Sequence, residues 1–136
     1  MRTGETLIRL AKHRVEAVQK LVASAEKTRS DMERRLEDLD ARAEREQRAA
    51  ETDPARATTW PAFMAALKVQ RGNIEASIAG VDDQLVLLRA DLAEAFEEQK
   101  KYETLEERRQ AREAESRARR EQARLDEAAL NRYARR

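Results

Sequence analysis

The chain has 136 residues, of which 40% are charged and only 4% are aromatic, and its formal net charge is +1. This composition excludes a thick globular core, because such a core needs more large apolar side chains than these residues provide. The absence of cysteine excludes a disulfide framework and a thiolate site. No apolar run approaches the roughly 18 residues of a membrane-spanning helix, so we expect a cytoplasmic protein without direct membrane insertion.

A periodic segment in the N-terminal half favours a long helix over disorder. Apolar residues recur there at alternating steps of three and four, and eleven of the thirteen positions in the series are apolar. Such a repeat keeps one apolar seam facing a partner helix, as in a coiled coil. The pattern predicts a helix over about residues 5–51. The seam positions are Ile8, Ala11, Val15, Val18, Val22, Ala25, Arg29, Met32, Leu36, Leu39, Ala43, Glu46 and Ala50.

The stretch DPARATTWPAF, residues 53–63, interrupts this pattern. It holds both prolines, the only tryptophan and one of the two phenylalanines. Proline disfavours a helical conformation of the residue before it, so the stretch predicts a turn over about residues 52–61 that contains a short helical piece. A second apolar seam follows and predicts a helix over about residues 62–133. Its positions are Met64, Leu67, Arg71, Ile74, Ile78, Val81, Leu85, Leu88, Leu92, Ala95, Gln99 and Tyr102.

Two seams of similar length joined by a short turn predict an all-α fold. We expect a long antiparallel coiled-coil hairpin of two helices, forming a single domain over residues 1–136. With the fold centre near residue 58, facing residues have numbers that sum to about 117, which places Glu46 opposite Arg71. Arg29 has no charged partner in this register, and we expect its stem to lie along the seam.

The C-terminal end is predicted to be an unpaired basic arm. In the same register the first helix begins beside residues near 110, so residues 110–136 project as a helical arm. Residues 108–136 carry ten basic and five acidic side chains. The interleaved acids, and Tyr133 as the one aromatic residue of the arm, favour a solvated or protein-binding face over nucleic-acid binding.

The sequence offers no catalytic, cofactor-binding or metal-binding constellation. His13 is the only histidine, and at helical spacing it has a single carboxylate neighbour, Glu16, which is too few ligands for a metal site. There is no glycine-rich phosphate loop, and no serine or lysine stands in the context of a nucleophile. We therefore expect a protein that is not an enzyme and has no cofactor.

Two interpretations fit the aromatic residues of the turn. Trp60 and Phe63 either plug the end of the coiled coil or, because two helices cannot cover an indole fully, form an exposed anchor for a protein partner.

Four stretches of the chain resemble the FliJ family of flagellar type III export proteins, whose relatives include coiled-coil stalk proteins of virulence secretion systems. These stretches are LIRLAKHRV, TWPAFMAAL, LRADLAEAFEEQKKYETLEERRQ and EQARLDEAALNRYARR, of which the last two are the most specific. The resemblance covers nearly the whole chain. It implies a cytoplasmic antiparallel hairpin, similar to the rotor stalk of rotary ATPases, that carries no catalysis.

The resemblance also implies protein partners. These are the hexameric export ATPase, the cytoplasmic domain of the export gate and export chaperones, with peripheral association at the inner membrane through the export apparatus. By resemblance, the end formed by both termini binds the ATPase, and the start of the second helix binds the gate. The implied ATPase-binding residues are Leu7, Leu10, Arg14, Glu103, Leu105 and Arg108.

For the gate, Phe63 and Leu67 fit an apolar contact, although Gln70 departs from the family pattern and Leu67 also belongs to the seam. Trp60 joins them as an aromatic residue at the tip of the hairpin. A second interpretation of the whole sequence is a generic coiled-coil spacer or dimerisation protein with another protein partner.

Overall fold

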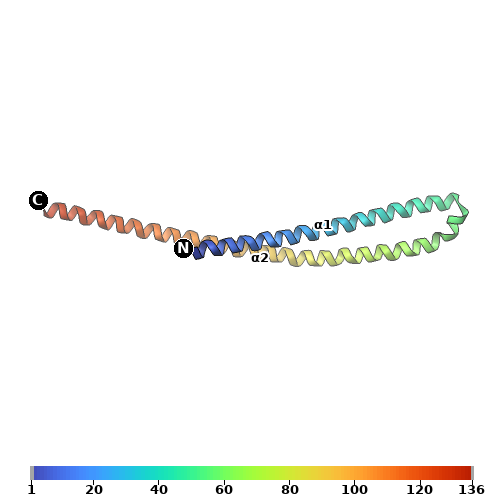
Figure 1. Ribbon diagram of the computed structural model, residues 1–136, viewed down its shortest axis with the longest axis horizontal. Coiled ribbons are helices and arrows are strands. Elements are labelled where there is room, and N and C mark those ends of the chain that lie inside the picture. Colours follow the sequence, from blue (N-terminus) through green and yellow to red (C-terminus); the bar gives the residue numbers. More distant parts are fainter. Residues whose placement is uncertain (1, 136) are drawn as a thin grey trace. The chain divides into compact units, whose positions relative to one another are not determined.

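This computed structural model describes residues 2–135, nearly all of which lie in two long helices. Helix α1 is Arg2–Thr52 and helix α2 is Pro54–Ala134, and the described residues contain no strand. Figure 1 shows the two helices side by side and antiparallel. The all-α hairpin predicted from the sequence is therefore confirmed.

Both helices contribute to each of two compact units. The terminal unit comprises the chain up to Val15 and the chain from Glu94 onward, and the central unit comprises Glu16–Ala93. That the two units act as one coiled-coil domain stays a prediction.

The helices pack along the seams that the sequence predicts. All thirteen seam positions of α1 are buried or half-buried, and so are eleven of the twelve positions of α2, Met64 being the exception. Alanine is common among the most buried residues because its short side chain lets two helices approach closely. These residues are Ala11, Val15 and Ala95 in the terminal unit and Ala25, Leu67 and Leu85 in the central unit.

The turn is shorter than predicted, because Asp53 alone separates α1 from α2. The Asp53 carboxylate accepts the backbone N–H of Ala55 over 3.0 Å, as the residue that caps a helix N-terminus does. Pro54 then occupies the first helical position, where its missing N–H removes no helical hydrogen bond. Helix α2 consequently begins at Pro54, whereas the sequence predicts a start near residue 62.

Pro61 lies inside α2 and does not begin it. In Figure 1 the green segment after α1 runs across to the antiparallel part of α2, so the first turns of α2 form the reversal and no separate helical piece precedes it.

Interhelical ion pairs in the central unit define a register that differs from the predicted one. Arg71 pairs with Asp40, and Arg29 pairs with Asp82 over 2.5 Å, and in both pairs the residue numbers sum to 111. The predicted pairing of Arg71 with Glu46 is therefore wrong, and so is the expectation that Arg29 has no charged partner. The physical reason is the early start of α2, which moves the fold centre toward the N-terminus.

Candidate functional site

A groove forms in the terminal unit where the start of α1 lies against α2. Its volume is about 240 Å³, and Leu7 and Leu105 line it from the two helices. The two residues are 37% and 49% exposed. The fold thus brings together two of the residues implied for ATPase binding, although they are far apart in the sequence. We call this the paired-end groove; its lining residues are Gly4, Leu7, Tyr102, Leu105, Glu106, Arg109 and Arg112.

Two further residues implied for ATPase binding, Leu10 and Arg14, lie on the following turns of α1. Leu10 is 59% exposed, which leaves its side chain open to a partner. The Arg14 guanidinium instead forms an ion pair with Glu98 of α2, and its Nη2 lies 3.9 Å from the Glu94 carboxylate. Arg14 therefore braces the two helices, and a partner has to compete with these carboxylates for it.

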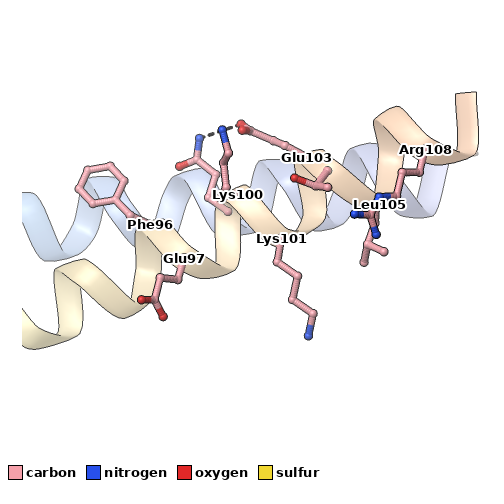
Figure 2. A pocket seen from close by; sticks show the side chains of 9 residues that line it. Phe96, Glu97, Lys100, Lys101, Glu103, Leu105 and Arg108 are labelled. Carbon is pink, nitrogen blue, oxygen red and sulfur yellow. Dashed lines mark hydrogen bonds between the residues drawn. The ribbon is translucent and has the colours of Figure 1, made fainter. Parts of the chain in front are cut away.

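The last two implied residues, Glu103 and Arg108, lie on the outer surface of α2. Together with Leu105 they line a shallow groove of about 650 Å³, which also includes Phe96, Glu97, Gln99, Lys100, Lys101 and Thr104 (Figure 2). Glu103 accepts a hydrogen bond from the Gln99 amide over 2.9 Å.

Six of the nine residues that line this outer groove were not predicted as site residues, and among them are Phe96, Lys100 and Lys101. Phe96 is 46% exposed, and Figure 2 shows it and Leu105 pointing to different sides of α2. Lys100 and Lys101 follow it, and within residues 2–135 they form no ion pair, nor does Arg108. One feature of the sequence could have indicated this groove: Phe96 is an aromatic residue that lies outside the seam within a highly charged stretch.

One wall of the paired-end groove contains the buried carboxylate of Glu106. Only 9% of this residue is exposed. Arg109 donates to its carboxylate from Nη2 over 2.8 Å and from Nε over 3.1 and 3.2 Å, and Gln110 donates over 3.3 Å. The hydrogen bonds from Arg109 lower the pKa of Glu106 against the opposing effect of burial, and the same bonds raise the pKa of Arg109. The pair is thus charged at neutral pH.

The tip of the hairpin carries a cluster of aromatic side chains in the central unit. The rings of Trp60 and Phe63 are stacked with their centroids 6.0 Å apart, and the guanidinium carbon of Arg42 lies 5.1 Å from the centre of the Phe63 ring. Trp60 and Phe63 are both half-buried. Arg42, which belongs to α1, holds this cluster by a cation–π contact that the sequence did not reveal.

Leu67, the third residue predicted for gate binding, lies inside the seam with only 6% of its surface exposed. It forms the floor of a groove of about 440 Å³ whose walls include Leu39, Pro61 and Met64. A partner at the tip therefore meets Trp60, Phe63 and the 38% exposed Met64 before it reaches Leu67.

The C-terminal part of α2 is exposed throughout residues 110–135. It remains helical to Ala134, and Figure 1 shows it continuing past the start of α1. Ion pairs along the helix support it, with Arg119 lying 2.5 Å from Glu115 and Arg124 lying 2.8 Å from Glu121. This segment is the basic arm of the sequence analysis.

Residues 2–135 contain no cluster of three or more histidine, aspartate or glutamate side chains that is arranged to hold a metal ion. His13 is an exposed residue of α1. No helix in the same range has the length and apolar composition to cross a membrane.

These features define an α-helical hairpin protein of the coiled-coil class, with exposed apolar and charged side chains at both ends of the helix pair. A family model described as flagellar FliJ protein matches residues 5–136. The chain therefore belongs to the FliJ family and is a component of the flagellar export apparatus. No curated protein and no solved structure matches it.

Proposed function

We propose that this chain is a non-catalytic stalk of the flagellar export apparatus. Its terminal unit binds the hexameric export ATPase, its tip binds the cytoplasmic domain of the export gate, and in this position it promotes delivery of export substrates and their chaperones. The protein then acts in the cytoplasm and associates with the inner membrane through the apparatus.

The observation that carries this proposal is the paired-end groove. Leu7 and Leu105 come from different helices, and both remain exposed. Such exposure is unfavourable, because the free energy falls when apolar side chains leave water. Lys100, Lys101 and Arg108 lie near Leu105 on α2 and line the outer groove with it. Exposed apolar side chains among cations suit a protein surface that offers an apolar contact and carboxylates.

The proposal is tested with the purified export ATPase. Addition of the full chain should accelerate ATP hydrolysis or allow ring assembly at a lower ATPase concentration. A shortened chain that ends at Glu107 keeps both seams but lacks Arg108 and Arg109 as well as the basic arm, and it should lose most of this effect while circular dichroism still reports the helical hairpin. Equal stimulation by both chains would remove the arm from the proposal, and no stimulation by either would refute the stalk function.

A generic dimerisation protein is the alternative, and one observation favours it. Val86 and Leu87 of α2 are 66% and 69% exposed, outside the seam. A second copy packed on this surface would bury them. Sedimentation equilibrium of the chain alone measures whether it forms a dimer, and sedimentation with the ATPase measures whether the two proteins bind. A stable dimer that does not bind the ATPase supports the dimerisation function and not the stalk function.

A further inference from the structure

The carboxylate of Glu106, a residue of α2, lies close to Gly4 in the first turn of α1. A Cβ atom added to Gly4 would lie 3.1 Å from Cδ of Glu106 and still closer to its Oε2. A Cβ added at Gly72 or Gly80 would meet no atom within 4 Å. Since no described residue has a positive φ, the backbone conformation does not require glycine at position 4. The obstacle to a Cβ atom at this position is the carboxylate at the end of the Glu106 side chain.

This carboxylate cannot easily move away. Within residues 3–135, Glu106 is the only charged residue that is buried, and Arg109 and Gln110 hold its oxygens by four hydrogen bonds. Arg109 is itself held from the other side by Glu113 over 2.9 Å. A Cβ at position 4 would therefore displace the first turn of α1 or break these bonds.

The contact also suits the electrostatics of the two elements. The N-terminal end of a helix carries a partial positive charge, because its first N–H groups have no partner within the helix. The charged Glu106 lies against the first turn of α1, so its carboxylate and that helix end attract each other.

We propose that Gly4, Glu106 and Arg109 form a latch that positions Leu7 against Leu105 and so shapes the ATPase-binding surface. Leu7 lies three residues after Gly4, and Leu105 immediately precedes Glu106. All five residues line the paired-end groove. When the first turn of α1 is seated on the carboxylate, the two leucines face one groove; when it is displaced, Leu7 moves away from Leu105. The inference rests on the proposed function, and the three latch residues act through the leucines.

The test compares Gly4→Ala with Gly72→Ala. Alanine favours a helix more than glycine does, so propensity alone predicts slower hydrogen exchange near either site. The latch instead predicts faster hydrogen exchange near position 4. In the free protein, amides of residues 6–10 should exchange about ten-fold faster in Gly4→Ala, as the first turns open more often, and no faster in Gly72→Ala. Circular dichroism checks that both variants keep the hairpin.

A second pair of variants tests the carboxylate. Glu106→Ala should also speed exchange at residues 6–10, and adding Gly4→Ala to it should have no further effect, because the obstacle is gone. Glu106→Asp retracts the carboxylate by one methylene group, so in the Gly4→Ala background it should restore part of the protection. Additive effects of Gly4→Ala and Glu106→Ala would overturn the latch.

The functional readout is the affinity for the export ATPase. It should fall about ten-fold in Gly4→Ala, stay unchanged in Gly72→Ala and recover in part in Gly4→Ala with Glu106→Asp. Faster exchange with unchanged affinity would refute the positioning role and leave the proposed function standing. If the unmodified chain does not bind the ATPase, the proposed function fails and the positioning role with it, while the exchange measurements still decide whether the latch exists.

Discussion

Arg29 of α1 donates from its Nε to the Asp82 carboxylate of α2 over 2.5 Å, inside a seam that is otherwise almost entirely apolar. The hydrogen bond and the charge of Asp82 raise the pKa of Arg29. Arg29 also pairs with Glu33 of its own helix, which is available in any register, whereas a carboxylate from α2 is available only in a register that brings Asp82 beside it. The pair therefore selects the register of the central unit.

Reversal of the Arg29–Asp82 pair tests this register. Arg29→Asp and Asp82→Arg should each lower the melting temperature, because each places like charges opposite one another, and the double variant should recover most of the loss. Asp83→Arg is the matched control, since Asp83 is the exposed neighbour of Asp82 and should change the melting temperature little. A double variant no more stable than the single ones would contradict the register.

Burial in the seam predicts unequal effects for two neighbouring leucines. Leu85 is 3% exposed and Leu87 is 69% exposed. Leu85→Ala should lower the free energy of unfolding by about 2–5 kcal/mol, since it leaves a cavity between the helices, whereas Leu87→Ala should change it by less than about 0.5 kcal/mol. Urea denaturation measures both. Similar losses would mean that Leu87 is covered in solution, as the dimer alternative requires.

The aromatic cluster at the tip predicts a loss of binding to the export gate. Trp60→Ala and Phe63→Ala should each weaken the complex at least ten-fold if these rings are anchors, with little change in helicity. Calorimetric titration with the gate domain measures this, and Val69→Ala, an exposed apolar residue of the same helix, is the control. Should the variants instead melt early while their folded fraction binds normally, the rings are a structural plug.

Acid should release the first turn of α1. Because the folded state holds the pKa of Glu106 below its ordinary value of 4.5, its stabilising contribution is complete above that value and disappears as the pH falls through the lowered pKa. Around the carboxylate stand Arg109 and Gln110 of α2, Glu113 behind Arg109, and the first turn of α1 at Gly4.

Protection factors of residues 6–10 should therefore fall below about pH 4 in the unmodified chain. Since other carboxylates titrate in the same range, Glu106→Gln is the reference, and its protection should depend less on pH. Parallel pH profiles of the two proteins would show that Glu106 is not responsible.

Two long helices and the faces along which they pack could be predicted from the amino-acid sequence. The three-and-four spacing of apolar residues needs no tertiary information, because a residue's place around a helix follows from its number. The seams beginning at Ile8 and Met64 were found in this way, and nearly all of their positions are buried or half-buried. Membership of the FliJ family could also be predicted from the sequence, from stretches such as LEERR and the basic C-terminal stretch EQARLDEAALNRYARR.

The tertiary structure alone decided the register and what each candidate site residue contacts. With a seven-residue repeat, several registers bury nearly the same apolar area. The register is therefore selected by the early start of α2 after Asp53 and by charged pairs such as Arg71 with Asp40. In the terminal unit Glu106 lies against Gly4, a contact that no sequence pattern marks, because it depends on which turn of one helix reaches which turn of the other. Periodicity specifies the face of a helix, but its axial position against a partner depends on side-chain contacts between segments far apart in the chain.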